Sequence, residues 1–357
     1  MPADSTRRLD SVQILRALAA LAVIWSHSTL EVSRFTEFDL RSFSALSSMG
    51  RIGVDIFFVI SGFVMVYVSS RQFGERGEAW RFVLRRIVRV VPVYWFYTSL
   101  ILGVLLLLPG LLRNNDLSWA HVVASYFFFP MSAPGKEDFH PLLGIGWTLN
   151  YEMFFYFMFA PFLLLTRSAA IWALSIVFCG LVFLGLFLSP AHGAIWFWTQ
   201  PIILEFLAGV LLGRIYLSDF RLPAAVSTGI LVLGVGWLVA VAEFWNKSGL
   251  DVRFLVTGIP AILFTSAIVL RQVVEDATTS SVWKFLIYLG DASYSLYLVH
   301  MFVIRVLTVI ISPTMLGAAY PFIYMMGVFG VCIPAAVISY RWIERPANGW
   351  LRRQFHV

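Results

Sequence analysis

The chain has 357 residues, of which 59% are hydrophobic and only 13% are charged. A soluble domain carries roughly 25% charged residues, and a mean hydropathy of +0.82 is too high for a surface that faces water. These values exclude soluble domains, a disordered chain, a disulfide scaffold and a nucleic-acid binder. They indicate a polytopic membrane protein.

Continuous apolar stretches recur along the whole chain. The hydrocarbon core of a bilayer is about 30 Å thick and needs about 20 apolar residues per helix, whereas a barrel would need alternating residues. The sequence therefore predicts an all-α polytopic membrane protein with a bundle of about ten transmembrane helices. The expected spans are 9–29, 52–70, 90–108, 147–166, 169–189, 196–217, 222–243, 252–271, 287–311 and 318–342.

The positions of the basic residues predict the orientation. With the N-terminus in the cytoplasm, 17 of the 26 Lys and Arg residues fall inside and 7 outside, while Arg16 and Arg305 lie within spans. Cytoplasmic loops are enriched in Lys and Arg, so both termini are expected to be cytoplasmic. We expect one transmembrane domain over residues 1–357, without a fused soluble domain.

One connecting segment, at about 109–146, is expected to lie outside the cell. It contains Lys136, His140 and an apolar patch at 126–130. The patch is too short to span a bilayer, so a re-entrant or interfacial segment is expected.

Arg16 and His27 lie in the first expected span, 11 residues apart. At about 100° per residue this spacing is three turns plus about 20°, so the two side chains share a face, about 16 Å apart along the axis. A path from the cytoplasm to the outer face could pass both. The alternative is a snorkelling arginine and an interfacial histidine that water satisfies.

Two carboxylates lie near the outer ends of expected spans. Asp55 could orient a histidine or could be an interfacial residue beside a small-residue packing notch. Glu152 could hold a histidine or a sugar hydroxyl. Trp147 could stack on a sugar ring, and Tyr151 lies in the same aromatic segment, which could equally be an interfacial aromatic belt.

The segment 71–89 carries six arginines and includes Arg86 and Arg89. Guanidinium groups bind phosphate with two parallel hydrogen bonds, so a phosphate clamp is one interpretation. The other is a topology signal or an anchor for anionic lipid.

His300 lies in the middle of the ninth expected span, and Arg305 is about 140° away from it around the helix. A buried histidine bonded to a neighbouring helix is one interpretation of His300. Cys179 and Cys332 both lie in apolar runs, so neither a disulfide nor a metal site is expected.

Taken together, six motifs resemble the acyltransferase family 3 membrane proteins, in family order and over essentially the whole chain. They are Arg16-x10-His27, GVDIFFVISGF at 53–63, Arg86-x-x-Arg89, WTLNYEMFFY at 147–156, SYSLYLVH at 293–300 and Glu344-Arg-Pro346. The N-terminal segment 9–16 further resembles the exopolysaccharide acetyltransferase branch. One departure is Phe302, where many relatives have a proline.

The resemblance implies an O-acyltransferase in the bacterial inner membrane. It would move an acyl group, usually acetyl, from cytoplasmic acetyl-CoA to a hydroxyl of an extracytoplasmic or lipid-linked polysaccharide. Arg16, Arg86 and Arg89 are then expected to hold the CoA phosphates. His27 is expected to act as general base with Asp55 or Glu152 orienting it, or to carry the acyl group itself. Trp147, Tyr151 and His300 are expected to contact the acceptor.

Two other classes fit the composition. A secondary transporter or flippase would also combine about ten spans with buried charges, although neither an inverted repeat nor paired broken helices is detectable. A non-catalytic scaffold of a polysaccharide assembly complex is the third. The sequence leaves the acceptor glycan and the length of the acyl chain open.

Overall fold

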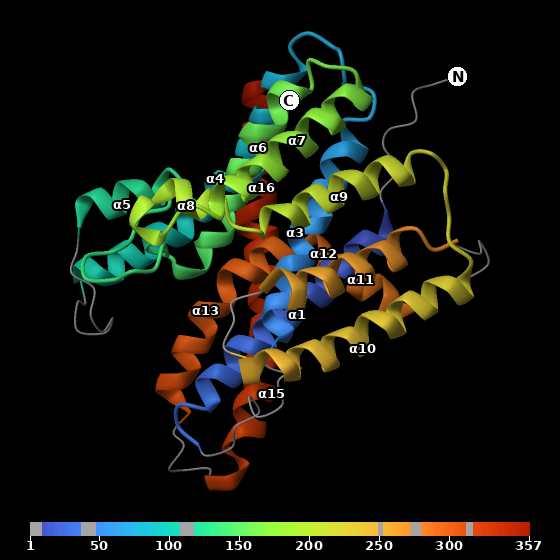
Figure 1. The fold of residues 1–357 in the computed structure, drawn as a ribbon. Coiled ribbons are helices and arrows are strands. Elements are labelled where there is room, and N and C mark those ends of the chain that lie inside the picture. The colour runs from blue at the N-terminus through green and yellow to red at the C-terminus, as the bar shows by residue number, and fades with distance from the viewer. Residues whose placement is uncertain (1–8, 37–47, 108–117, 249–252, 273–279, 312–316) are drawn as a thin grey trace. The chain divides into compact units, whose positions relative to one another are not determined.

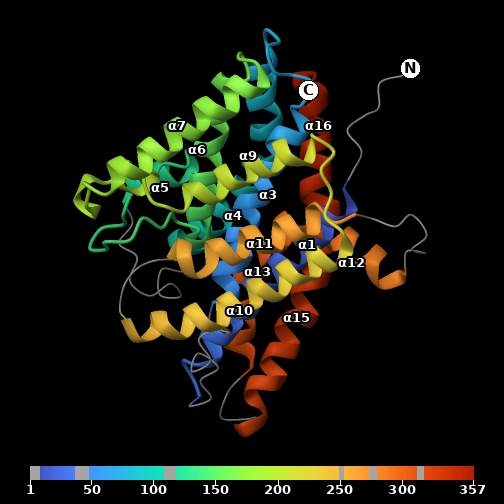
Figure 2. The same cartoon turned by 45° about the vertical axis from the view of Figure 1, so that its right-hand side comes forward.

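A computed structural model describes residues 9–36, 48–107, 118–248, 253–272, 280–311 and 317–357. Within these ranges the regular structure is helical (Figures 1 and 2), and the one strand-like feature is an isolated bridge between Leu222 and Arg271. The all-helical architecture expected from the continuous apolar runs is therefore confirmed.

Eight helical segments of the described ranges are long and apolar enough to cross a membrane. Two of the ten expected spans instead contain shorter helices. One is α6 (Trp147–Phe162), and the other is the apolar stretch Phe254–Val269. A 16-residue helix is about 24 Å long, short of the roughly 30 Å core. The count of about ten spans and the cytoplasmic termini stay predictions. The eight segments are Asp10–Val32, Gly50–Val68, Glu78–Leu107, Arg167–Gly185, Ala194–Tyr216, Ala224–Val241, Ser293–Ile310 and Tyr320–Phe355.

The chain divides into two compact units, each built from two separate stretches of sequence. Unit 1 contains residues 1–68 and 208–340, and unit 2 contains residues 69–207 and 341–357. The prediction of a single transmembrane domain is not tested by this division.

Unit 1 is built around α1 (Asp10–Val32). The helices α3 (Met49–Val68), α12 (Ser281–Asp291), α13 (Ser293–Ile310) and α15 (Tyr320–Ser339) pack against it. The other elements that lie wholly in unit 1 are α10 (Ala224–Ser248), the π-helix η5 (Phe254–Gly258), α11 (Ile259–Val269) and η6 (Gly317–Ala319).

Small residues allow the helices of unit 1 to approach α1 closely. A Cβ atom on Gly53 of α3 would lie 2.5 Å from the carbonyl oxygen of Ala19, and one on Gly290 of α12 would lie 2.0 Å from that of Gln13. Close backbone contact through small residues is typical of membrane helix pairs, where dispersion forces drive association. These contacts fix the position of α1, which carries Arg16 and His27.

Unit 2 is built around α4 (Glu78–Leu107), against which α6 and α16 (Arg345–Phe355) pack, while α7 (Arg167–Gly185) packs on α6. Its core is aromatic: the rings of Phe155 and Phe206 stack with centroids 4.1 Å apart, and both side chains are fully buried. The remaining elements are η3 (Gly144–Gly146), η4 (Pro190–His192), α8 (Ala194–Trp198), α9 (Ile203–Tyr216), which continues from unit 2 into unit 1, and η7 (Tyr340–Glu344).

The expected extracytoplasmic loop is described from residue 118 onward, and its residues 109–117 lie outside the described ranges. It contains α5 (Trp119–Tyr126), eight residues long and too short to cross a bilayer. The loop packs on α4, because Trp95 Nε1 donates to the Tyr126 carbonyl at 2.8 Å and the Tyr94 hydroxyl donates to the Ser125 carbonyl at 3.0 Å. Its placement outside the cell stays a prediction.

Candidate active site

Two histidines from distant parts of the sequence meet between α1 and α13. His27 Nδ1 lies 3.1 Å from His300 Nε2, and the ring centroids are 5.1 Å apart. The other ring nitrogen of His300, Nδ1, lies 2.6 Å from the carbonyl oxygen of Tyr297. His300 is completely buried. His300 is therefore a buried histidine bonded to a neighbouring helix, which was one of the two interpretations of this residue.

These contacts determine where the protons lie when both rings are neutral. A carbonyl only accepts, so His300 Nδ1 carries a proton and donates it to Tyr297. His300 Nε2 is then the acceptor, and His27 Nδ1 must be the donor. This tautomer leaves the lone pair of His27 on Nε2, the nitrogen that can accept a proton from a substrate.

Arg16 also binds to α13. Its Nε and Nη2 atoms donate to the hydroxyl of Ser293 at 3.1 and 2.9 Å. The 11-residue spacing predicted that Arg16 and His27 share a face of α1, and both side chains do contact α13. Ser293 begins α13 and His300 lies seven residues later, so the two helices run in the same direction. We call this row of polar contacts the α1–α13 seam.

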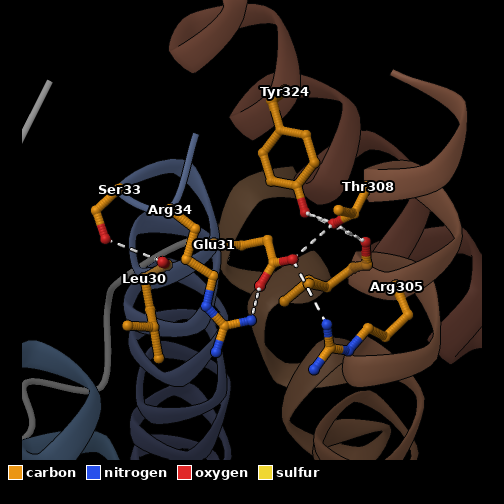
Figure 3. A network of polar contacts seen from close by, with 8 residues as sticks. Leu30, Glu31, Ser33, Arg34, Arg305, Thr308 and Tyr324 are labelled. Carbon is orange, nitrogen blue, oxygen red and sulfur yellow. Dashed lines mark hydrogen bonds and ion pairs between the residues drawn. The ribbon is translucent and has the colours of Figure 1, made fainter. Parts of the chain in front are cut away.

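A third set of contacts lies one turn beyond His27 (Figure 3). The buried carboxylate of Glu31 is 2.7 Å from Arg34 Nη1 and 3.6 Å from Arg305 Nη1. Thr308 of α13 donates to Glu31 at 3.3 Å, and its hydroxyl is 2.9 Å from that of Tyr324 on α15. The long side chain of Arg305 thus reaches α1 although it leaves α13 about 140° from His300.

Asp55 is fully buried in α3, and the structure pairs it with an arginine. Arg253 Nη2 lies 2.5 Å from Asp55 Oδ1. Asp55 was one of two carboxylates that could orient His27. The structure shows Asp55 bonded to Arg253, and His300 is the residue next to His27 Nδ1.

In unit 2, Arg86 of α4 is buried between aromatic rings. Its guanidinium carbon lies 5.3 Å from the ring centroid of Phe82 and 5.4 Å from that of Tyr156. The Tyr156 hydroxyl donates to Glu152. Arg89 is half-buried one turn further along α4. The structure therefore brings together two motifs, Arg86-x-x-Arg89 and WTLNYEMFFY, in what we call the Arg86 cluster.

Trp147 and Tyr151, expected to contact the acceptor, begin α6. Tyr151 is buried, and its hydroxyl donates to the carbonyl of Phe197 at 2.6 Å. Trp147 is half-buried, and its ring lies edge-to-face with that of His140 at 6.4 Å. Of the two, the structure leaves Trp147 the more accessible to a sugar ring.

Metal-ligating side chains do not converge anywhere in the part of the chain that the structure describes: no group of three or more His, Cys, Asp and Glu residues could hold an ion. Cys179 and Cys332 are both free thiols.

Sequence reasoning missed the His27–His300 contact and the contacts of Glu31 with Arg34 and Arg305. The two histidines are 273 positions apart, so spacing carries no signal for their contact. A signal did exist for Glu31, because a residue four positions after His27 lies on the same helix face.

Comparison with known proteins identifies the family. A family model described as an acyltransferase domain, of acyltransferase family 3, matches residues 9–340. The exopolysaccharide production protein ExoZ of Rhizobium meliloti (strain 1021) is 34% identical over 299 residues, which cover 84% of this chain and 90% of ExoZ. The acyltransferase MdmB of Streptomyces mycarofaciens is 26% identical over 324 residues, 84% of this chain and 79% of MdmB.

A Staphylococcus aureus (strain COL) protein provisionally named an O-acetyltransferase is 24% identical over 366 residues, 95% of this chain but only 57% of that protein. No solved structure matches the chain. The family match spans both units and includes the α1–α13 seam and the Arg86 cluster. The chain belongs to acyltransferase family 3 and is a membrane-embedded acyltransferase.

Proposed function

We propose that the protein transfers an acetyl group from cytoplasmic acetyl-CoA to a hydroxyl of an extracytoplasmic or lipid-linked polysaccharide, in a bacterial inner membrane. The observation that carries the proposal is the His27–His300 contact, which leaves a basic nitrogen on His27. The names of ExoZ and of the Staphylococcus aureus relative support the substrate class, and the distribution of basic residues supports the orientation.

In the direct route, His27 Nε2 removes the proton from the acceptor hydroxyl. The hydroxyl oxygen attacks the thioester carbonyl carbon, and a new C–O bond forms. The C–S bond then breaks, and the thiolate of CoA receives the proton from His27. General-base catalysis of this kind contributes about 10²- to 10⁴-fold to a rate.

The alternative is a covalent route. His27 Nε2 attacks the thioester carbonyl carbon, the C–S bond breaks and the CoA thiolate leaves, so that the acetyl group is carried on the imidazolium. The acceptor oxygen then attacks the acetyl carbon, the N–C bond breaks, and the hydroxyl proton passes to the freed Nε2 and from there to the CoA thiolate. In both routes His300 has a positioning role. It accepts the Nδ1 proton of His27 and so keeps the reactive lone pair on Nε2. We propose this role for His300 in place of direct contact with the acceptor.

In unit 2, Arg86 and Arg89 are proposed to bind the phosphates of the donor. In the segment 71–89, Arg81 and Arg85 are both ion-paired with Glu78. Arg86 instead rests on aromatic rings, whose cation–π contact leaves its N–H donors available for phosphate oxygens. Arg89 would add a second guanidinium.

In unit 1, Arg16 would line the path along which the thioester reaches His27. The two residues are about 16 Å apart along α1, which is the distance that an extended pantetheine arm has to cover from the cytoplasmic half of the membrane.

In unit 2, the segment that begins α6 is proposed to contact the acceptor. Trp147 is proposed to stack on a sugar ring, while the buried Tyr151 would shape the segment that carries it. Glu152 holds the Tyr156 hydroxyl, and we propose that it supports Arg86 through this ring. Asp55 holds Arg253, so its role is to fix α3 against η5.

The test uses purified protein in proteoliposomes with radiolabelled acetyl-CoA on the cytoplasmic side. We expect CoA release in the wild type and a loss of at least about 100-fold in His27→Ala. His356→Ala, at an exposed position in the last turn of the chain, is the matched control and should match the wild type.

Label trapped on the wild-type protein would favour the covalent route. Near-normal CoA release in His27→Ala would refute both routes. Absence of CoA release under every acceptor condition would refute acetyl-CoA as the donor.

A further inference from the structure

A buried carboxylate with two arginines lies at the C-terminal end of the α1–α13 seam. Burial of Glu31 requires a cationic partner, because an unpaired carboxylate in an apolar interior is strongly unfavourable. Arg34 meets that need alone: its Nη1 lies 2.7 Å from Glu31 Oε2. Arg305 is a second cation on the same carboxylate, so the group as a whole carries one net positive charge.

Both guanidinium groups point part of their surface away from Glu31. The side chain of Arg305 is 58% exposed and that of Arg34 is 49% exposed, whereas that of Glu31 is 6% exposed. Each contact with Glu31 uses one nitrogen, and a guanidinium has five N–H donors in a planar fork. Figure 3 shows Glu31 between the two arginines, one from each side of the seam.

Hydroxyl groups around Glu31 hold its carboxylate in place, and one nearby hydroxyl, that of Tyr320, has no hydrogen-bond partner among the described residues. The Thr308 hydroxyl has one proton, which it donates to Glu31 or to the carbonyl of Ile304, and its oxygen can accept from the Tyr324 hydroxyl. The ring of Tyr320 stacks on that of Tyr324 at 5.4 Å. Among the described residues, the buried hydroxyl of Tyr320 has no hydrogen-bond partner. A buried hydroxyl without a partner is uncommon in proteins, and this one belongs to the ring that stacks on Tyr324.

The position of the group connects it with the proposed active site. Glu31 follows His27 by four residues, about 6 Å along α1 and about 40° around it. One sugar residue is about as long as this rise. A glycan whose anionic group binds the arginines would therefore place a neighbouring hydroxyl beside His27.

We propose that Glu31, Arg34 and Arg305 form a subsite for an anionic group on the acceptor glycan, a carboxylate or a phosphate. This inference rests on the proposed function and adds the charge class of the acceptor. Arg34 and Arg305 bind the oxyanion, and Glu31 is a positioning residue that holds the two guanidinium groups in place. The anion could belong to an acidic sugar of the polymer or to the phosphate of a lipid-linked sugar.

The test is equilibrium binding to purified full-length protein in nanodiscs. The probes are fluorescently labelled maltotriose, trigalacturonate and maltose 1-phosphate. We expect an anionic probe to bind at least about tenfold more tightly than maltotriose, because charge-assisted hydrogen bonds are worth more than about 1.4 kcal/mol. Preference for trigalacturonate indicates an acidic sugar, and preference for maltose 1-phosphate indicates a lipid-linked sugar.

The variants Arg305→Gln and Arg34→Gln should remove the preference, and Arg305→Lys should restore it in part, because lysine retains the charge but lacks the fork. Arg353→Gln, an exposed arginine in the last turn of α16, is the matched control and should keep the preference. Folding of each variant is checked by thermal unfolding of the same samples.

An equal affinity for all three probes, or a preference that survives in Arg305→Gln and Arg34→Gln, would overturn the subsite. A role in binding anionic lipid would also overturn it. In that case the Arg34→Gln and Arg305→Gln variants would lose only the extra thermal stability that the protein has in phosphatidylglycerol nanodiscs compared with phosphatidylcholine nanodiscs. This test is separable from that of the proposed function. His27→Ala should lose CoA release and keep the anion preference, so either property can fail alone.

Discussion

The α1–α13 seam and the Arg86 cluster both place arginine in an apolar helix bundle, but they hold it differently. In the seam, polar groups from two helices bond to one another: Arg16 with Ser293, and His27 with His300. In the Arg86 cluster, the guanidinium rests on aromatic rings from α4 and α6.

The two kinds of contact suit different chemical tasks, namely orienting a proton acceptor and stabilising a positive charge. Directed hydrogen bonds fix tautomers and orient a proton acceptor, whereas ring faces stabilise a positive charge without using its N–H donors. The contacts around His27 are of the kind that the proposed proton transfer needs, and those around Arg86 are of the kind that the proposed phosphate binding needs.

The largest expected effect comes from separating the helices of the seam. Gly290→Ala would place a Cβ atom 2.0 Å from the carbonyl oxygen of Gln13, so α12 would have to move away from α1. We expect a loss of about 3 kcal/mol in the free energy of unfolding, measured by thermal unfolding in detergent. Gly330→Ala is the control, since its Cβ would meet no atom within 4 Å. Equal melting temperatures for the two variants would contradict the close packing of α12 on α1.

Replacing the acceptor of the His27 proton should damage chemistry more than binding. His300→Phe removes the atom that His27 Nδ1 contacts at 3.1 Å, and we expect kcat for CoA release to fall about 100-fold with little change in KM. His300→Gln retains an acceptor oxygen and should recover part of the loss. If both variants behave alike, His300 contributes packing and no hydrogen bond to the reaction.

The Arg86 cluster should respond in the opposite way. Arg86→Gln removes a guanidinium that rests on Phe82 and Tyr156, and we expect KM for acetyl-CoA to rise about tenfold. Arg86→Lys should show an intermediate value. The matched control is Arg85→Gln, because Arg85 is ion-paired with Glu78 and should leave KM near that of the wild type. An equal rise of KM in Arg86→Gln and Arg85→Gln would show that Arg86 has no special role in binding the phosphates.

The smallest expected effect tests the first contact of the seam. Ser293→Ala removes the hydroxyl that accepts two hydrogen bonds from Arg16, at 3.1 and 2.9 Å. Arg16 is half-buried, so water can replace part of this contact, and we expect a loss of about 1 kcal/mol. Thermal unfolding measures it, with the exposed Ser218→Ala as control. A melting temperature equal to that of the control would show that Ser293 does not anchor Arg16.

The sequence by itself determined the fold class, the family and one face of α1. Continuous apolar runs specify helices because the lipid core cannot satisfy open backbone groups. The 11-residue spacing of Arg16 and His27 specifies a shared face because helix periodicity is a local property. Tertiary structure decided which residues those side chains meet.

The partners of His27, Glu31 and Asp55 are His300, Arg305 and Arg253, each from a helix more than 190 positions away. Periodicity shows which way a side chain points, but which helix it meets depends on how distant helices pack, as α3 and α12 pack on α1 through Gly53 and Gly290. For this reason the contacts of Asp55 with Arg253 and of His300 with His27 cannot be predicted from sequence spacing.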